Sequence, residues 1–416
     1  MNYFQLKLFM IDSRSTSNTT TDITPWAVFL IFLRLGLTSF GGPVAHLAYF
    51  RDEFVVRRRW LSEQSYADIV ALCQFLPGPS SSQVGIALGV SRSGFWGAVA
   101  AWCGFTLPSA LLLILFALGI SHYSEVIPSG FLDGLKVAAV AVVAQAIWGM
   151  ARQLSADTVR ATITVLAASL ILLFPSAWIQ VAVIMLAPIF GLILFKPKIV
   201  ESHEVLRLPL TRRIGTLCLS LFLILLIGIP LCAAYFPNTS LAIIDAFYRA
   251  GSLVFGGGHV VLPLLQAEVV PNGWVNNDAF LAGYGAAQAV PGPLFTFAAF
   301  LGASFTMAPN GFLGGLLALF AIFMPSFLLV IGALPFWEQL RHYPRTQTAL
   351  IGINAAVVGL LVAAFYDPVW TSAIHAPQDF ALALVALLAL MMWKLPPWLV
   401  VIGSGVLAWL LTTVLG

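Results

Sequence analysis

Charged residues are scarce in this chain of 416 residues: Lys, Arg, Asp and Glu together make up 9% of it, whereas a soluble domain carries about 25%. Hydrophobic residues make up 60%, and apolar runs extend over its whole length. These proportions exclude a soluble protein and predict an integral membrane protein with little mass outside the lipid bilayer. The formal net charge of +3 is too small to indicate a nucleic-acid partner.

Cysteine is also rare. The four cysteines stand singly in apolar runs and form no C-x-x-C pair, so we expect neither a disulfide framework nor a metal site. The sequence has no Walker loop, no H-E-x-x-H and no G-x-S-x-G, which argues against ATP hydrolysis and against an intramembrane enzyme. We expect no cofactor. Residues 11–24 are polar and rich in Ser and Thr, and no apolar core with a small-residue cleavage site precedes them, so the N-terminus does not resemble a cleavable signal peptide. We expect residues 1–24 to form a disordered tail.

What the chain does contain is an internal repeat. The stretch from Arg34 to Gly42 returns, 215 positions later, as the stretch from Arg249 to Gly257. The stretch Gln74–Pro79, which ends in Pro-Gly-Pro, returns 214 positions later as Gln288–Pro293. Repeats that interrupt apolar segments are typical of transporters built from two related halves.

Thirteen apolar segments can be marked, of which six belong to each copy of the repeat and the seventh has no counterpart. One unpaired crossing between two six-segment halves inverts the second half. The sequence therefore predicts an all-α polytopic membrane protein with two inverted-topology repeats joined by one linking transmembrane helix. The expected parts are the tail 1–24, a first repeat 25–196, a linker and connecting helix 197–236, and a second repeat 237–416.

The distribution of positive charge sets the expected orientation. With a cytoplasmic N-terminus and a C-terminus outside, most Lys and Arg residues between segments fall in the cytoplasm, as the positive-inside rule requires. The loop Arg51–Arg59 is the exception. It returns to the cytoplasm if the segments interrupted at Gly41-Gly42-Pro43 and Pro77-Gly78-Pro79 are re-entrant hairpins, because their pieces are too short to span the membrane. We expect nine full spans and four interrupted segments in a cell (inner or plasma) membrane.

Arg34 and Arg249 occupy equivalent places within strongly apolar stretches. An arginine at such a depth usually faces a cavity or a partner, and its planar fork of donors fits an oxyanion. The sequence leaves two alternatives open. Arg34 could extend to the membrane interface, and Arg249 could pair with Asp245 four residues earlier.

The glycines and prolines are the second group of candidate substrate-binding positions. Broken helices expose backbone N–H groups whose dipoles attract anions, and irregular backbone inside a membrane must be buried in protein or face water. Close helix packing is the alternative. These candidates are Gly41, Gly42, Pro77, Gly78 and Pro79 in the first half, and Gly256, Gly257, Pro291, Gly292 and Pro293 in the second.

Several polar residues flank the breaks. Ser80 begins a Ser-Ser-Ser-Gln run that could cap a half-helix and bind a ligand, whereas the second copy has Leu294 there. Gln74 and Gln288 precede the breaks and either contact the ligand or join helices. Lys136 is a third candidate cation, although Asp133 is placed to pair with it.

Three residues are candidates for proton coupling. His46 and His259 follow the two glycine motifs and titrate in the right range, with buried packing as the alternative. Glu63 stands beside Ser62, where helix capping is the other explanation.

Together these motifs resemble the chromate ion transporter family, in its long form with two fused halves. The resemblance rests on Arg34-x-Gly-x-x-x-Phe40-Gly-Gly-Pro43, on Trp60-Leu-Ser-Glu63 and on Gln74-x-x-Pro-Gly-Pro79, with second copies that include Trp274 and Gln288-x-x-Pro-Gly-Pro293. It covers about residues 25–416 and implies export of chromate from the cytoplasm. Gly258 replaces the proline of the first copy, so the halves are not chemically equal.

From these features we predict a transporter of a divalent tetrahedral oxyanion. Export of chromate, with protons as a coupling ion, is the first hypothesis. Uptake of sulfate, which has the same shape and charge, is the alternative, and a lipid-phosphate flippase or membrane enzyme is an alternative of another class. The expected partners are chromate or sulfate and the lipid bilayer, and a homodimer is left open.

Overall fold

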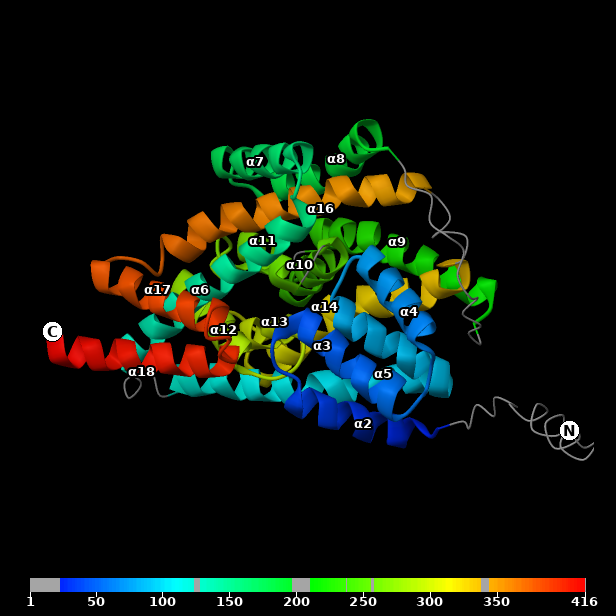
Figure 1. The fold of residues 1–416 in the computed structure, drawn as a ribbon, viewed down its shortest axis with the longest axis horizontal. Coiled ribbons are helices and arrows are strands. Elements are labelled where there is room, and N and C mark those ends of the chain that lie inside the picture. The colour runs from blue at the N-terminus through cyan, green and yellow to red at the C-terminus, as the bar shows by residue number, and fades with distance from the viewer. Residues whose placement is uncertain are drawn as a thin grey trace, which may run out of the picture.

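In the computed structural model almost all of the described chain is helical (Figure 1). The structure describes residues 23–122, 128–196, 210–236, 238–255, 258–337 and 344–415, and no strand occurs in these ranges. The all-α prediction is confirmed. Most of the predicted tail and the part of the linker from 197 to 209 lie outside the described residues, as do Gly256 and Gly257.

The first half contains short helices followed by longer ones. Its elements are α2 (Pro25–Thr38), α3 (Gly42–Arg51), the π-helix η1 (Asp52–Arg57), α4 (Glu63–Phe75), α5 (Ser80–His122), α6 (Ser129–Leu154), α7 (Thr158–Leu173) and α8 (Ala177–Leu194). A single helix, α9 (Arg212–Tyr235), separates the halves.

The second half is divided into more elements. Its elements are α10 (Thr239–Leu253), the 3-10 helix η2 (Gly258–Val260), α11 (Val261–Val269), α12 (Asn277–Ala289), the 3-10 helix η3 (Leu294–Thr296), α13 (Phe297–Ala303), α14 (Gly311–Ala333), the 3-10 helix η4 (Leu334–Phe336), α16 (Pro344–Ala364), the π-helix η5 (Phe365–Trp370), α17 (Pro377–Met391) and α18 (Pro397–Leu415).

The same local signals begin the equivalent helices of the two halves. The Ser62 hydroxyl accepts from the Ser65 backbone N–H at 3.1 Å and caps α4. Its counterpart, the Asn276 side chain, accepts from the Ala279 N–H at 2.7 Å and caps α12. Each cap satisfies a donor that the first turn of a helix leaves free. At this position the repeat in the sequence has a counterpart in the local structure.

In each of the first two segments of the first half, the two ends lie close together. The Ser93 hydroxyl donates to the Ile23 carbonyl, and the Arg92 guanidinium donates to the Trp60 carbonyl. The start of α2, the loop before α4 and the kink in α5 therefore lie at one end of the bundle. We call this end, from which α2 enters, the N-terminal face (Figure 1).

The kink in α5 reverses the chain. Ser93 and Gly94 depart from helical φ and ψ values, and a side chain placed on Gly89 would meet the carbonyl of Gly97. Those two residues would be about 12 Å apart in a continuous helix. Gly302 and Gly314 make the corresponding contact between α13 and α14. The predicted division of residues 64–120 into two segments therefore matches a fold-back within α5.

In the second half the corresponding parts of the chain also lie close together. Thr306, before α14, donates its backbone N–H to the Trp274 carbonyl at 3.0 Å. The start of α10 reaches the same place, since Asn238 and Pro309 line one surface cavity. The chain ends its last helix, α18, at the opposite end of the bundle from the start of α2 (Figure 1), and we call that end the C-terminal face.

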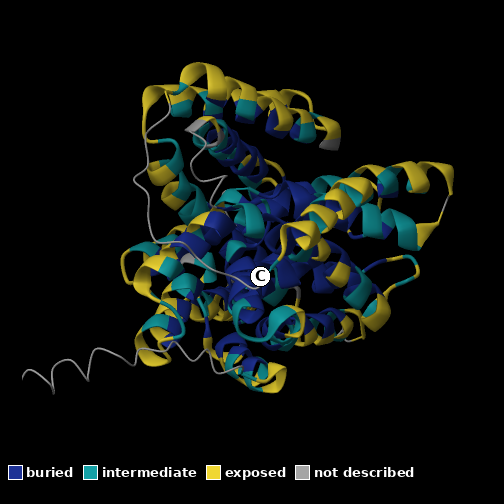
Figure 2. Cartoon of the chain, turned by 90° about the vertical axis from the view of Figure 1, so that its right-hand side faces the viewer, coloured by how far each residue is buried: buried dark blue, intermediate teal, exposed yellow. Residues whose placement is uncertain are grey.

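Residues at the centre of the molecule are buried, and much of its outer surface is apolar. Buried residues gather in the middle of the bundle, and exposed ones lie on the outer helices (Figure 2). Many exposed side chains are large and apolar, among them Leu217, Ile224 and Ile227 of α9. In the most apolar stretch of α9 only 6% of the residues are buried. A protein surface of this kind requires lipid around it.

In the part of the chain that the structure describes, six helices are long and apolar enough to cross a membrane, and they lie within α5, α6, α9, α14–η4, α16–η5 and α18. The polytopic prediction is confirmed. The helices α7, α8 and α17, expected as full spans, have 16, 18 and 15 residues, which is short for a bilayer core of about 30 Å. The count of nine full spans and the inversion of the second repeat stay predictions.

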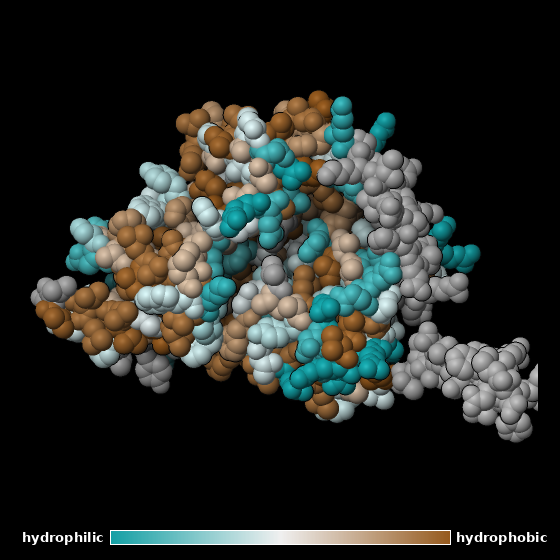
Figure 3. Space-filling model, in the orientation of Figure 1, coloured by the Kyte–Doolittle hydropathy of each residue, from teal (hydrophilic) through white to brown (hydrophobic). Residues whose placement is uncertain are grey.

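The exposed face in Figure 3 is unevenly coloured. Hydrophobic residues predominate over α17 and α18 at lower left, hydrophilic residues gather around α4, and the centre of the face is hollowed. The short helices α3 and α4 lie beside this hollow in the view of Figure 1.

Candidate functional site

The helix breaks of the two halves are joined in pairs. The backbone N–H of Gly78, in the first Pro-Gly-Pro, donates to the carbonyl of Val254 at 2.7 Å. The backbone N–H of Gly292, in the second Pro-Gly-Pro, donates to the carbonyl of Ser39 at 2.9 Å. Ser39 and Val254 are equivalent residues that end α2 and α10. The breaks predicted from the repeat therefore meet, and each half completes the break of the other.

Glycine is required at both contact points. Gly78 has φ +121° and Gly292 has φ +105°, values that other residues rarely adopt. A Cβ on Gly78 would lie 2.9 Å from the Ser326 hydroxyl, and one on Gly292 would lie 2.7 Å from the Ser109 hydroxyl. Ser109 and Ser326 follow the prolines of α5 and α14 at matching places. These two serines are site residues that the sequence reasoning did not single out.

The prolines around each glycine shape the break. The Pro77 carbonyl accepts from the Gln83 side-chain amide at 2.6 Å, and the Pro79 carbonyl accepts from the Gln83 backbone N–H at 2.9 Å. The carbonyl of Pro293 accepts from Thr296, whereas Pro291 precedes Gly292 and contributes its ring. Because proline has no N–H, the chain cannot continue as a helix through either triplet.

The glycine motif of the first half is open. Gly41 and Gly42 have φ +100° and +77°, and a Cβ on Gly42 would meet no atom within 4 Å. The next residue, Pro43, lies close to Gly258 of the second half, with 3.5 Å between its ring and a Cβ built there. Pro43 and Gly258 are counterparts, so the two glycine motifs meet where the halves join. Gly256 and Gly257 cannot be placed, because they lie outside the described residues.

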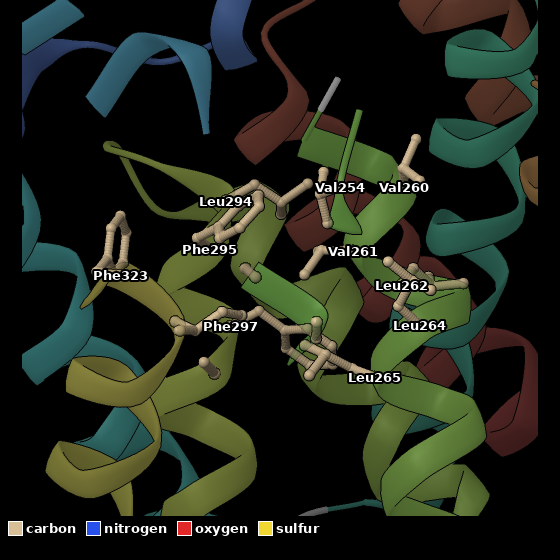
Figure 4. Close-up of a cluster of buried hydrophobic side chains, with 14 of the residues drawn as sticks. Val254, Val260, Val261, Leu262, Leu264, Leu265, Leu294, Phe295, Phe297 and Phe323 are labelled. Carbon is tan, nitrogen blue, oxygen red and sulfur yellow. The ribbon is translucent and has the colours of Figure 1, made fainter. Parts of the chain in front are cut away.

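The two sides of this junction differ in polarity. On the second-half side the break is lined by apolar groups, among them Val254, Val261, Leu294 and Phe295 (Figure 4). On the first-half side Ser80 begins α5, and the next three residues, Ser81, Ser82 and Gln83, are buried. The inequality expected from the sequence is therefore present in the packing.

Buried polar atoms without partners concentrate at the polar side of the breaks. Within the described residues no hydrogen bond reaches the hydroxyls of Ser39, Ser82, Thr106 and Ser326, or the side-chain oxygen of Gln83. A buried polar atom without a partner is costly. A protein commonly retains such unpartnered hydroxyls where they can donate hydrogen bonds to a ligand. Of these, Ser82 and Gln83 belong to the predicted run, and the others were missed.

His46 belongs to this polar group. It is buried, and its ring nitrogens lie 3.2 Å from the Ser39 carbonyl and 3.3 Å from the Ser81 hydroxyl. His259 lies instead 2.7 Å from the Tyr284 hydroxyl. The two histidines therefore have different partners, as expected for positions that are not equivalent. Glu63 forms an exposed ion pair with Arg51 at 2.5 Å.

The two glutamines before the breaks also differ. Gln74 is exposed, whereas Gln288 is half-buried and its amide nitrogen has no partner in the described residues. Gln288 is therefore the better placed of the two to bind a ligand at the junction of the halves.

Arg34 lies on the exposed side of α2, near the buried carboxylate of Glu53 in η1. Burial raises the pKa of Glu53, but hydrogen bonds from Arg58 and Arg57 and the charge of Arg34 outweigh it, so that this pKa lies below its ordinary value. The surroundings of Arg34 thus carry more positive than negative charge. Such a place attracts anions.

Arg249 has a different environment. Its guanidinium lies 2.6 Å from Asp245 and 2.8 Å from Glu268, and all three side chains are less than one-fifth exposed. The pairing with Asp245 that the spacing allowed is present, with a second carboxylate that it did not suggest. Arg34 and Arg249 share no ion-pair partner in the described part of the chain. Their contacts therefore do not support the expectation that two free arginines converge on one site.

Lys136 is paired as well. Its ammonium lies 2.7 Å from Asp133 and 3.0 Å from Asp278 of α12, so the expected pair with Asp133 is present and a bridge between the halves accompanies it. The group borders a cavity of about 500 Å³ that reaches Asp379 of α17 and Thr412 near the end of α18. Lys136 therefore lies at the C-terminal face, apart from the breaks.

A polytopic helical bundle with an apolar outer surface and paired helix breaks at its centre defines a multi-pass membrane transporter. The family model described as "Chromate transporter" matches this chain twice, at residues 26–192 and 241–409. The chain belongs to the chromate transporter family. This is a family of transporters and not of enzymes.

Curated relatives agree with this assignment. The "Chromate transport protein" of Pseudomonas aeruginosa is 28% identical over 417 residues, which cover 96% of each chain. The protein of the same description from Cupriavidus metallidurans is 24% identical over 394 residues and 91% of each chain. The "Uncharacterized transporter YwrA" of Bacillus subtilis is 31% identical over 169 residues, which make up 40% of this chain and 93% of that protein. No solved structure matches this chain.

Proposed function

We propose that this protein exports chromate from the cytoplasm through a site at the paired helix breaks, in exchange for protons. Family membership supports chromate as the ion. The observation that carries the location is the pair of reciprocal bonds, Gly78 to Val254 and Gly292 to Ser39. They bring four interruptions from both halves to one place, as a transporter of two related halves requires.

The proposed site binds the anion with neutral donors. Ser82 and Ser326 contribute hydroxyls that have no other partner in the described residues, and the first turn of α5 contributes backbone N–H groups at the positive end of its dipole. A tetrahedral oxyanion accepts several such bonds at once. Gln288 adds an amide donor from the second half.

Arg34 has a separate role in this proposal. It attracts the anion toward the breaks from the N-terminal face, which we place in the cytoplasm. Arg51, Arg57, Arg58 and Arg92 lie in the same part of the molecule, and a cytoplasmic face rich in arginine agrees with the positive-inside rule. The C-terminus is then outside, and the second repeat is inverted with respect to the first.

The direction of transport follows from charge. At a membrane potential of about 100 mV, interior negative, one charge corresponds to about 2.3 kcal/mol, so a dianion that leaves the cell gains about twice that amount. Uptake of the same ion would need coupled cations to offset it. Export is therefore the favoured direction. Rocking of the two halves about the junction between Pro43 and Gly258 would open the site to each face in turn.

Everted membrane vesicles test this proposal. Labelled chromate should accumulate in vesicles that contain the wild-type protein, and unlabelled sulfate in excess measures the selectivity of the site. The double variant Ser82→Ala, Ser326→Ala should accumulate at least tenfold less. Ser404→Ala is the matched control, because Ser404 is equally buried but lies on α18. No accumulation by the wild type, or full accumulation by the double variant, would overturn the proposal.

A further inference from the structure

Asp245, Arg249 and Glu268 form a buried group with an unmatched charge. Arg249 donates to both carboxylates, and the exposed fractions of the three side chains are 14%, 17% and 16% in chain order. Two carboxylates against one guanidinium leave a net charge of −1 if all are ionised. A charge that water cannot reach freely, at the depth of an apolar helix, is strongly disfavoured.

No second cation compensates this charge within the described residues. The neighbouring helices α8 and α14 contain no Asp, Glu, His, Lys or Arg. The charged residues of α16 and α9 are confined to their first turns, where α16 has Arg345 and α9 has Arg212 and Arg213. Trp178 of α8 lies over the guanidinium at 5.9 Å. His259, before α11, is engaged with Tyr284. One proton on the carboxylates is the remaining way to neutralise the group.

Another trio in the protein shows why burial matters here. Lys136 also lies between two carboxylates, but Asp133 and Asp278 are 52% and 74% exposed. Water stabilises their second charge, so that group needs no proton. Both trios have two carboxylates and one cation, but only the buried trio around Arg249 needs a proton.

A cavity lies between the C-terminal face and the buried group. A cavity of about 260 Å³ reaches from Ser176 and the exposed Asp367 to Gln180 and Gln266. Gln180 also lines a smaller space against Arg249 and Glu268. Asp367 has its own partner, the Thr371 hydroxyl at 3.2 Å. Glu268 is the carboxylate of the trio that lines this smaller space, and Gln266 and Ala267, just before it in the chain, line the larger cavity.

The first half does not have this arrangement. Glu53 is the counterpart of Glu268, but it is bound by Arg57 and Arg58. The counterpart of Asp245 is Leu30. Equivalent glutamates are therefore surrounded by excess positive charge at the N-terminal face and by excess negative charge toward the C-terminal face. The asymmetry suits an anion that enters at one end and a proton that enters at the other.

We propose that the trio of Asp245, Arg249 and Glu268 is a proton-binding site, loaded from the C-terminal face through the cavity beside Gln180, and that its proton is the one exchanged for chromate. The coupling part rests on the proposed function. The proton adds to a carboxylate oxygen and takes the trio from a charge of −1 to zero. Asp245→Asn or Glu268→Gln alone should abolish proton binding, because the remaining carboxylate matches Arg249.

The test uses two measurements on the full-length protein. Infrared difference spectroscopy across neutral pH should show the C=O band of a protonated carboxyl in the wild type. The band should be absent in Asp245→Asn and in Glu268→Gln. It should remain in Asp157→Asn, which alters a carboxylate that is 49% exposed and pairs with Arg160. A band that persists unchanged in both trio variants would overturn the assignment, whatever the protein transports.

Proteoliposomes with a clamped membrane potential provide the second measurement. In the wild type each pH unit of gradient should raise the equilibrium chromate ratio about tenfold per exchanged proton. Glu268→Gln should still carry chromate but lose this response, and Asp157→Asn should keep it. A response retained by Glu268→Gln would overturn the coupling role and leave chromate export standing. If the wild type moves no chromate, the proposed function and the coupling role fail, and the infrared band alone decides the proton site.

Discussion

The backbone N–H of Gly78 donates to the carbonyl of Val254, across 176 positions of sequence and from one half of the protein to the other. Its counterpart joins Gly292 to Ser39. Each of these bonds satisfies a donor that a Pro-Gly-Pro break leaves free and an acceptor at the end of a half-helix. The junction of the halves is thus made by the backbone itself, and side chains can differ around it.

The first prediction concerns that glycine. Gly78→Ala should reduce chromate transport at least tenfold and destabilise the protein by about 1–3 kcal/mol, because alanine disfavours a positive φ and its Cβ would lie 2.7 Å from the Gln83 amide. Gly228→Ala in α9, where a Cβ meets nothing within 4 Å, is the control and should be neutral or stabilising. Thermal unfolding and vesicle flux measure both effects, and equal behaviour of the two variants would contradict the prediction.

The second prediction separates the two arginines. Arg249→Gln should destabilise the protein by about 3–5 kcal/mol, since it leaves two buried carboxylates without their partner. Arg34→Gln should change stability by less than about 1 kcal/mol, because Arg34 is exposed, but should lower the rate of chromate flux at low salt. Thermal unfolding in detergent compares them. Equal losses of stability would show that the two environments are alike.

The third prediction tests the hairpins by labelling. In a variant without the native cysteines, Arg58→Cys should react with a membrane-impermeant thiol reagent in everted vesicles but not in intact cells. Asn310→Cys, at the corresponding end of the second half, should show the reverse. Both residues reacting from the same side would exclude the inverted arrangement.

The fourth prediction concerns movement at the C-terminal face. Lys136 and Asp278 join the halves at 3.0 Å, beside the cavity of about 500 Å³. If the halves separate there during transport, a short cross-link between Lys136→Cys and Asp278→Cys should stop chromate flux, and cleavage of the link should restore it. Each single variant treated with the same reagent is the control. Undiminished flux through the cross-linked protein would place the movement elsewhere.

The fifth prediction is a pH dependence outside the membrane-spanning helices. The pKa of Glu53 is lowered in the folded protein, so its ion pairs stabilise the protein above the unfolded pKa and lose this effect as pH falls through the folded value. Glu53→Gln should therefore be less stable than the wild type at pH 7, and the difference should shrink below about pH 4. Asp52→Asn, in an exposed pair, should show a much smaller difference. A constant difference at all pH values would refute this.

The sequence predicted the breaks better than their connections. Gly and Pro determine backbone shape locally, so the interruptions at Gly78 and Gly292 could be foreseen from their residue types. Which break meets which depends on contacts between the halves, and a repeat alone does not contain that information. Ser326 was missed for the same reason, since only the fold brings it beside Gly78.

Ion pairs within one helix could be predicted from the sequence, whereas ion pairs between helices could not. The Asp245–Arg249 pair, at a spacing of four residues in one helix, was open to prediction. Glu268 belongs to another helix, α11, and became visible as a partner only in the structure. From the sequence, Arg34 and Arg249 were predicted to be equivalent because their neighbours along the chain are alike. In space, Arg34 has an excess of positive charge around it and Arg249 has two carboxylates.

The crossed bonds also have a consequence for biogenesis. A chain emerging from the ribosome presents Gly78 long before Val254 has been made, and Ser39 long before Gly292. The first half therefore enters the membrane with its two central breaks open, and only synthesis of the second half can close them. The junction of the halves can close only after residue 292 has been made, and helices that follow it, such as α16 and α18, must still pack against the first half. A chain truncated before residue 292 would be left with this junction open to quality-control proteases.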